Sequence, residues 1–174
     1  MEIRSITAAD AAALSRFFQR IPEADRTFLK EDVNDPRVIE HWVLPETARS
    51  IAVDDGEIVG SVAVVPLHGW SSHVGEVRLV VDPVYRGRGI GRLLARQAVL
   101  DAVQAGLGKL VVEVIADQEA LIAMFRGLGF EPEALLHDHV RDRSGQLRDL
   151  IVLANSVDEQ FAALTTAGLA EQLS

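Results

Sequence analysis

Glycine and arginine alternate in one short run, which extends from Arg86 to Gly91 and reads Arg-Gly-Arg-Gly-Ile-Gly. Glycine lets the backbone turn sharply and present its N–H groups to a ligand. If a helix begins within this run, its first N–H groups and the positive end of its dipole also attract anions. The guanidinium groups of Arg86, Arg88 and Arg92 would add charge-assisted hydrogen bonds. The run therefore predicts a binding site for phosphate or pyrophosphate.

The spacing of these glycines argues against two common phosphate motifs. A dinucleotide fingerprint, Gly-x-Gly-x-x-Gly, places Arg92 at its last position when counted from Gly87, and Leu94 when counted from Gly89. A Walker loop needs Gly-Lys-Ser/Thr, which the sequence lacks. An ordinary glycine-containing turn before an exposed, arginine-rich helix is the alternative interpretation.

Local patterns predict the elements that would position this run within one mixed α/β domain. Strands are expected at Glu2–Thr7, Ser50–Val53, Ile58–Val65, Gly75–Asp82, Lys109–Ala116, Ala134–Arg141 and Leu147–Ala154. Helices are expected at about Ala8–Arg20, Val38–Trp42, Gly89–Ala105, Gln118–Leu128 and Asp158–Leu173, with the remainder of 21–46 irregular. The unit from Gly75 to Ala116 should form a right-handed crossover between two parallel strands. We expect a single domain over residues 1–157 and a helical extension over 158–174.

The bulk composition limits the function further. The chain has 174 residues, a net charge of −9, 48% hydrophobic residues and no cysteine. These values predict a globular domain without disulfides, thiolate metal sites or a cysteine nucleophile. An acidic chain is a poor general binder of nucleic acid, and no apolar run is long enough for a membrane span. No secretory signal is visible, so the cytoplasm is the expected location.

The stretch from Val80 to Leu94 resembles the central motif of the GNAT superfamily of acyl-CoA-dependent N-acetyltransferases. Its signature, Gln/Arg-x-x-Gly-x-Gly/Ala, is matched by Arg86, Gly89 and Gly91. Gly129-Phe130, after an amphipathic helix, resembles a second motif of the family. The expected order of elements also agrees with the family fold, which is a mostly antiparallel sheet with one parallel strand pair, flanked by helices.

The resemblance implies that acetyl-CoA, or a close acyl-CoA relative, is the acyl donor and that no metal is needed. Backbone amides from Arg86 to Gly91 would hold the pyrophosphate. The strand Glu76–Val81 would splay away from Lys109–Ala116, and the pantetheine arm would pair with backbone groups of Leu79 and Val81. The residues assigned to the cofactor are Leu79, Val80, Val81, Arg86, Gly87, Arg88, Gly89, Ile90, Gly91, Arg92, Gln118 and Phe125.

The family's chemistry, direct attack of an amine on a thioester, implies a base that takes a proton from the ammonium. We select Glu76, because it stands on the strand leading to the phosphate loop, where the resemblance often places a carboxylate. Burial in an apolar sheet could raise its pKa toward neutrality. The alternative is that Glu76 is solvated, or pairs with Arg78 or a neighbouring strand. His73 is a second candidate base, although it stands near the start of the strand and could be exposed.

The family's general acid is missing from the pattern. Many relatives carry a tyrosine five residues before the final Phe of the Gly-Phe motif, where this chain has Phe125. Gln118 stands where an asparagine is frequent and could still form a hydrogen bond. Tyr85, the sole tyrosine, belongs to the loop and is expected to be structural.

Other chemistry-bearing residues give weaker signals. His137 and His139 would lie on one face of a strand, but no third metal ligand is apparent. Trp42 and Trp70 flank the expected substrate side, where they would line the acceptor pocket or pack in the core.

Three functions remain open at this point. The first is an N-acetyltransferase for a primary amine, in a small molecule or a protein lysine or N-terminus. The second, suggested by Phe125, is a weak or silent acyl-CoA-binding regulatory module. The third is a nucleotide-binding domain of another type. A homodimer is compatible with the pattern.

Overall fold

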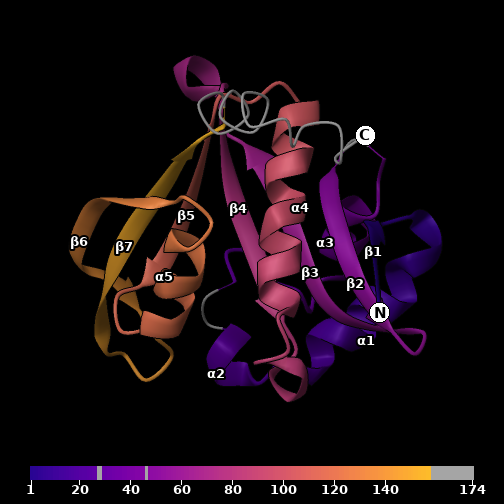
Figure 1. Ribbon diagram of the computed structural model, residues 1–174. Helices are drawn as coiled ribbons and strands as arrows, with labels where there is room; N and C mark the ends of the chain where they lie inside the picture. The colour runs from indigo at the N-terminus through magenta and orange to yellow at the C-terminus, as the bar shows by residue number, and fades with distance from the viewer. Residues whose placement is uncertain (27–28, 46, 158–174) are drawn as a thin grey trace.

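The computed structural model of the chain describes residues 1–26, 29–45 and 47–157. One sheet of seven strands runs through it in the order β1-β2-β3-β4-β5-β7-β6 (Figure 1). The strands are β1 Glu2–Ser5, β2 Ala48–Asp54, β3 Glu57–Pro66, β4 Val74–Val81, β5 Lys109–Ile115, β6 Glu131–Arg141 and β7 Leu147–Ser156. All seven predicted strands are thus present, with ends that differ by a few residues. The mixed sheet that we expected is confirmed.

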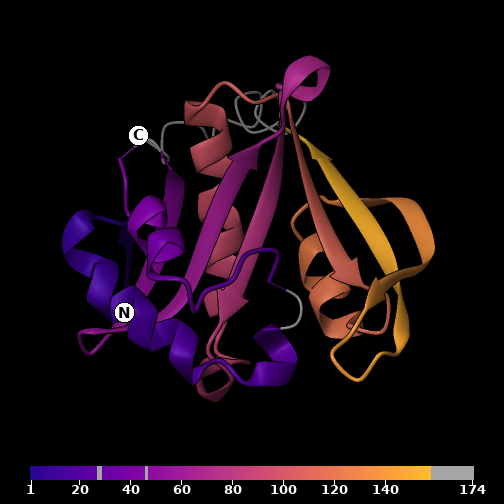
Figure 2. The ribbon, with the colours of Figure 1, turned by 180° about the vertical axis from the view of Figure 1, so that it is seen from behind.

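Helices cover both faces of this sheet. They are α1 Ala11–Arg20, α2 Glu23–Arg26, α3 Pro36–Trp42, α4 Ile90–Gln104 and α5 Glu119–Arg126. α4 and α5 lie on one face, and α1, α2 and α3 lie on the other, as the two opposite views show (Figures 1 and 2). The sequence pattern missed α2, which is a single turn with no buried residue and therefore has no apolar periodicity to detect. The predicted helix over Asp158–Leu173 lies outside the described residues.

Two hydrophobic clusters hold these layers together. The larger packs the inner faces of α4 and α5 against the sheet, around Leu94, Ala98, Leu110 and Phe125. The smaller joins α1 and α3 to the other face, where Phe17, Phe18 and Trp42 meet edge to face or tilted. The middle of the sheet is therefore buried on both faces, and it forms a rigid support for any site along its edge.

β4 and β5 are the one parallel pair in the described sheet, and they stay paired for only a short distance. Val74, Gly75 and Glu76 align with Lys109, Leu110 and Val111, and the pairing ends there. Each strand then continues beside its antiparallel neighbour on the far side, β3 or β7, so β4 and β5 diverge (Figure 2). The crossover and the splay that we expected between these two strands are confirmed.

Gly75 is the middle residue of this short parallel pairing, and neighbouring side chains crowd the place where its side chain would be. A Cβ on Gly75 would lie 2.7 Å from both Leu107 Cδ1 and Val64 Cγ1. We expect Gly75→Val to destabilise the fold by roughly 1–3 kcal/mol, because overpacked cores must shift side chains or backbone. Urea unfolding followed by circular dichroism measures the change.

A double variant tests the stated cause of that loss. Leu107→Ala removes one of the two overlapping methyl groups, so Gly75→Val and Leu107→Ala together should cost less than the sum of the single changes. Strict additivity would contradict the overlap.

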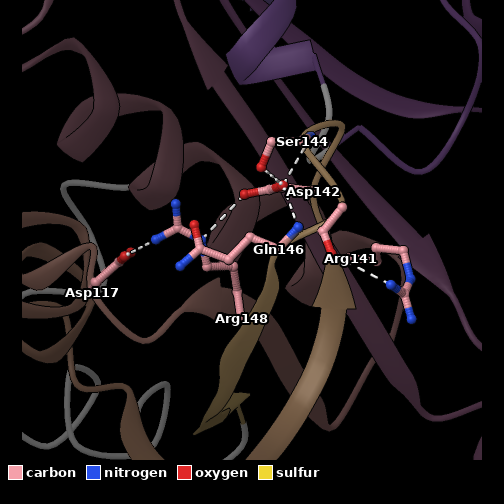
Figure 3. A network of polar contacts seen from close by, with 7 residues as sticks. Asp117, Arg141, Asp142, Ser144, Gln146 and Arg148 are labelled. Atoms are coloured by element: carbon pink, nitrogen blue, oxygen red, sulfur yellow. Dashed lines mark hydrogen bonds and ion pairs between the residues drawn. The ribbon is translucent and has the colours of Figure 1, made fainter.

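The turn between β6 and β7 is organised by one carboxylate, that of Asp142 (Figure 3). It accepts hydrogen bonds from Ser144 N at 2.9 Å and Gln146 N at 3.0 Å, and from Arg148 Nε at 3.3 Å. Arg148 also donates to Asp117 at 2.6 Å, next to the start of α5. Arg143, at the tip of this hairpin, forms an ion pair with Glu23 of α2. The hairpin is thereby connected to elements on both sides of the diverging strands.

β6 is irregular at the two histidines. Its register shifts between Leu136 and Val140, and Asp138 between the histidines has φ of +52°. The expectation that His137 and His139 follow a regular strand alternation is therefore wrong. His137 Nδ1 lies 3.0 Å from Asp149, in an exposed contact.

Candidate functional site

The divergence of β4 and β5 opens into a cavity of about 1020 Å³. It extends from the glycine-rich run, past the outer half of β4, to the start of α5 and to α2 and α3. Of the predicted site residues, those that line it are Glu76, Leu79, Val80, Val81, Arg86, Gly87, Gly89, Ile90, Gly91, Arg92, Gln118 and Phe125. Arg88 does not line this cavity. Chain folding has brought together residues from β4, α4 and α5 that the sequence keeps apart.

The glycine-rich run presents free main-chain donors at the mouth of this cavity. Gly87 and Gly89 have φ of +76° and +81°, a left-handed conformation that favours glycine. Among the described residues, nothing accepts a hydrogen bond from the N–H of Gly87, Arg88 or Gly89. α4 begins at Ile90, and its first paired amide is Leu93 N, which donates to Gly89 O at 3.1 Å. The amides before it, at the helix N-terminus, are those that can bind an anion.

One amide of the predicted set is already in use. Arg86 N donates to Pro83 O at 3.3 Å, because Pro83–Tyr85 forms a 3₁₀ turn that ends at Arg86. Our expectation that backbone amides from Arg86 onward are available is therefore wrong by one residue, and the free donors begin at Gly87.

The three arginines around this run have distinct positions. Arg86 forms an ion pair with Asp25 of α2, and its Nε donates to Val81 O at 3.3 Å. Arg92 donates to Gly127 O at 3.2 Å, and Arg88 lies 4.9 Å from the ring centre of Tyr85. Arg88 thus contacts Tyr85 of the loop but does not line the cavity itself, whereas Arg86 and Arg92 place their positive charge at the cavity wall.

The outer half of β4 has main-chain groups that face the gap. Asp82 N donates to Val59 O of β3, and Lys109 N of β5 donates to His73 O. Successive residues of a strand direct their N–H and C=O to opposite sides, so those of Leu79 and Val81 face β5. Since β5 has diverged there, these are the groups that can pair with an extended ligand.

Glu76 lies where the two strands part. It is 7% exposed, and its carboxylate contacts Lys30 Nζ at 2.6 Å and Arg78 Nη2 at 3.1 Å. Burial alone would raise the pKa of Glu76, but the hydrogen bonds from Lys30 and Arg78 outweigh it and hold this pKa below its usual range. The expected rise of the Glu76 pKa toward neutrality is therefore wrong. The sequence pattern did not predict that Lys30 contacts Glu76. The expected alternative, a pair with Arg78, is present.

Two residues of this cluster were missed by the sequence analysis, Lys30 and Glu113. Lys30 Nζ lies between two carboxylates, 2.6 Å from Glu76 and 2.8 Å from Glu113 on β5. Burial opposes its charge, yet Glu113 and Glu76 raise the pKa of Lys30. Glu113 interrupts an apolar strand, Leu-Val-Val-Glu-Val-Ile, and that interruption was the available signal. Lys30 stands in an irregular segment and gave none.

The contact with Lys30 makes a prediction about the Glu76 carboxyl. Lys30→Met removes an ammonium that favours the ionised form, and it leaves Glu76 buried and near Glu113. The pKa of Glu76 should therefore rise. A ¹³C carboxyl NMR titration of the wild type and the variant measures this shift directly.

Lys109→Met is the matched control for this titration. Lys109 contacts Glu133 at 2.5 Å, outside the cavity, so its removal should leave the Glu76 titration unchanged. A Glu76 pKa that stays in place, or falls, in Lys30→Met would contradict the assigned cause.

Of the remaining candidate residues, two line the cavity and two do not. Trp42 is 6% exposed and lines it, and Tyr85 lines it as well. Trp70 is 97% exposed and does not line it, so the expected role of Trp70 beside the substrate is wrong. His73 is exposed at the closed end of the β4–β5 pair and is not part of the wall.

Phe125 and Gln118 sit on the α5 side of the cavity. Phe125 is 1% exposed, and its ring packs edge to face on Phe130 at 5.1 Å. It offers an apolar surface and no proton. Gln118 is the exposed N-cap residue of α5, where its side-chain amide is free to turn toward a ligand.

The described part of the chain has neither a metal-binding cluster nor a membrane-spanning helix. Within residues 1–26, 29–45 and 47–157, no three His, Asp or Glu side chains gather in a way that could hold a metal ion. No helix in these ranges has the length and apolar character of a membrane span.

Comparison with known proteins gives the class that this fold and cavity define. The family model described as the acetyltransferase (GNAT) family matches residues 12–130, and the chain belongs to that family. It is an acetyltransferase. The Mycobacterium tuberculosis N-alpha-acetyltransferase RimI is 31% identical over 142 residues, which are 80% of this chain and 84% of RimI. The uncharacterized Escherichia coli N-acetyltransferase YjgM is 27% identical over 135 residues, 74% of this chain and 81% of YjgM.

A solved structure agrees in fold. The YncA protein of Salmonella typhimurium, described with its cofactor acetyl-CoA, superposes with a TM-score of 0.76 over 91% of this chain and 94% of YncA, at 20% identity. The match of the family model confirms the resemblance that we noted around Arg86, Gly89 and Gly91 as family membership.

Proposed function

We propose that this protein transfers the acetyl group of acetyl-CoA to a primary amine by direct attack, with no covalent enzyme intermediate. The observation that carries the proposal is a single continuous cavity. It joins the free amides around Gly89 to the carboxylates of Glu76 and Glu113 through the gap between β4 and β5. A donor bound by its phosphates at one end would have its reactive end near the carboxylates at the other.

The residues present fit such a donor. The amides of Gly87, Arg88 and Gly89 and the first turn of α4 suit a pyrophosphate, with Arg86 and Arg92 supplying positive charge. A Cβ at Gly87 or Gly89 would meet nothing within 4 Å, so the space beside these amides is open to a ligand. Leu79 and Val81 can pair with the amides of a pantetheine arm. The thioester itself supplies the activated acyl carbon.

The carboxylates would bind the acceptor and receive its proton. Two carboxylates stabilise an ammonium and so favour its binding, as the contacts to Lys30 illustrate. One ammonium proton passes first to a carboxylate, directly or through water, because only the neutral amine has a lone pair for attack. The nitrogen becomes more acidic as its new C–N bond forms, and it releases its second proton at that stage. The C–S bond breaks, and CoA leaves as a thiol or thiolate. Phe125 cannot assist this departure, but a thiolate is a tolerable leaving group.

The test is a thiol-release assay, which is free of protein background because the chain has no cysteine. Purified protein, acetyl-CoA and a panel of free amino acids, polyamines, aminoglycosides and peptides with free N-termini or lysines are mixed. Release above the uncatalysed rate, with an N-acetylated product by mass spectrometry, would support the proposal. No release with any amine would refute it.

A second function is favoured by Phe125, which takes the position where relatives carry a proton donor. It is an acyl-CoA-binding regulatory module without turnover. Calorimetry separates the two, because acetyl-CoA binding without turnover of any amine is the result that this alternative requires.

A further inference from the structure

Arg49 has a buried guanidinium that forms no ion pair with any described residue. It stands on β2, is 6% exposed and lines the cavity. Its Cζ lies 4.0 Å from the ring centre of Trp42, and its Nη1 donates to Ser61 Oγ at 3.2 Å. Its Nε is buried and has no hydrogen-bond partner in the described part of the chain. A buried cation without a counter-charge is costly, so a charge of this kind calls for an explanation.

The charge of Arg49 is present at neutral pH. Burial lowers the pKa of Arg49 to about 10, and the nearby Arg78 acts in the same direction while Glu31 opposes it. The ring of Trp42 lies against the guanidinium, and Ser61 accepts one hydrogen bond from Nη1, so the edge formed by the other Nη hydrogens remains for a planar anion. A carboxylate matches this edge, because its two oxygens can accept parallel hydrogen bonds.

The sheet places Arg49 on the same face as the catalytic candidates. Arg49 is opposite Ala63 on β3, and Ala63 is opposite Arg78 on β4, so their side chains share a face. Glu76 is two residues before Arg78 and lies on that same face. The small side chain of Ala63 leaves room between the two arginines. Arg78 is committed to Glu76 and Glu31 at 3.1 Å each, whereas Arg49 contacts none of the described acids.

The carboxylates of Glu76 and Glu113 already hold an ammonium group. Lys30 Nζ sits between Glu76 and Glu113, so the geometry there suits a primary ammonium group. The cavity therefore combines a place for a cation at the carboxylates with a place for an anion at Arg49.

Because β3 and β4 lie between Arg49 on β2 and Glu113 on β5, one acceptor can reach both places only if its amine lies several bonds from its carboxylate. We propose that the acceptor is a free amino acid with a side-chain amine, whose ammonium replaces that of Lys30 between Glu76 and Glu113 and whose carboxylate binds Arg49. This inference rests on the proposed acetyl transfer and specifies its acceptor. One proton of the ammonium passes to a carboxylate, and the neutral amine nitrogen then bonds to the acetyl carbon. The C–S bond breaks, and a second proton from that nitrogen leaves with CoA as the thiol. The product is an N-acetyl amino acid.

The experiment compares matched acceptors on matched variants. Each L-amino acid is assayed beside its decarboxylated amine and its carboxamide, with thiol release as the readout. The proteins are the wild type, Arg49→Met, Arg49→Lys and Arg37→Met. Arg37 is an exposed arginine paired with Asp35 outside the cavity, so its variant controls for the loss of one positive charge. Thermal unfolding confirms that each variant is folded.

We expect lysine or another L-amino acid with a side-chain amine to be preferred over its decarboxylated amine. Arg49→Met should raise the KM for that amino acid roughly 10- to 100-fold, the loss expected for a charged hydrogen bond. It should leave the KM for the decarboxylated amine unchanged, which a merely structural role would not do. Arg49→Lys should recover part of the loss, because lysine keeps the positive charge but lacks the paired N–H donors of a guanidinium. Arg37→Met should behave as the wild type.

Other outcomes overturn the inference while acetyl transfer stands. One such outcome is that carboxyl-free amines or peptide N-termini are better acceptors than L-amino acids. Another is that Arg49→Met changes the KM equally for an L-amino acid and for its decarboxylated amine. If no amine gives thiol release, the proposed function fails. Calorimetry of L-amino acids binding to acetyl-CoA-loaded protein then tests the Arg49 site independently of turnover. Binding to the wild type that Arg49→Met abolishes would support the site, and no binding would overturn it.

Discussion

Glu76→Gln is expected to lower the turnover number by roughly 100-fold or more, the usual contribution of a positioned base. Glutamine keeps the shape and the hydrogen-bonding oxygen of Glu76 but cannot accept the proton of an ammonium. Since Glu76 lies at the parting of β4 and β5, away from the amides near Gly89, the affinity for acetyl-CoA should stay nearly constant. Steady-state kinetics with the best amine and calorimetry with acetyl-CoA measure the two effects.

Glu113→Gln distinguishes the two carboxylates in the same experiment. Both contact Lys30, but Glu76 is buried and held by Arg78, whereas Glu113 is partly exposed. Unchanged turnover in Glu76→Gln with a large loss in Glu113→Gln would transfer the role of base to Glu113. Glu133→Gln, at an ion pair outside the cavity, is the control that should change neither quantity.

Gly89→Ala should weaken acetyl-CoA binding roughly 10- to 100-fold, as expected for loss of one or two hydrogen bonds to a charged group. The new methyl group would point into open space beside the free amides, where the pyrophosphate is proposed to lie. The left-handed φ of +81° also disfavours alanine, by about 1–2 kcal/mol. Calorimetry gives the change in Kd.

Gly89→Ala has two effects, backbone strain and blocked amides, and a control variant can separate them. A second left-handed glycine, Gly106, follows the other end of α4. Gly106 has φ of +69°, a Cβ there would meet nothing within 4 Å, and it lies outside the cavity. Gly106→Ala should lose similar stability and keep its affinity for acetyl-CoA. Equal loss of affinity in the two variants would mean that helix stability, and not ligand contact, governs binding at Gly89.

Much of this site was predictable because it is local in sequence. Five of the six residues from Arg86 to Gly91 line the cavity, and the free amides arise from glycines directly before a helix. Such features depend on backbone conformations that neighbouring residues impose.

The acceptor side was not predictable in this way. Lys30 comes from an irregular segment, Glu76 and Glu113 come from two different strands, and Arg49 comes from a third. The wrong pKa direction for Glu76 has this origin, because its environment is set by Lys30, which no periodic pattern relates to β4. The site roles considered for Trp70 and His73 were wrong for the same reason. Both residues are close in sequence to β4, but neither lines the cavity.

The sequence by itself determined a glycine-rich loop with free amides before a helix, the order of the strands and helices, and the family. These depend on short-range patterns: glycine spacing, apolar alternation and the absence of cysteine. Only the tertiary structure decided which charges face one another, where β4 and β5 separate, and that a buried arginine lacks a counter-ion among the described residues. Electrostatic environments sum over groups from distant segments, and burial decides how strongly those groups interact, so they exist only once the chain is folded.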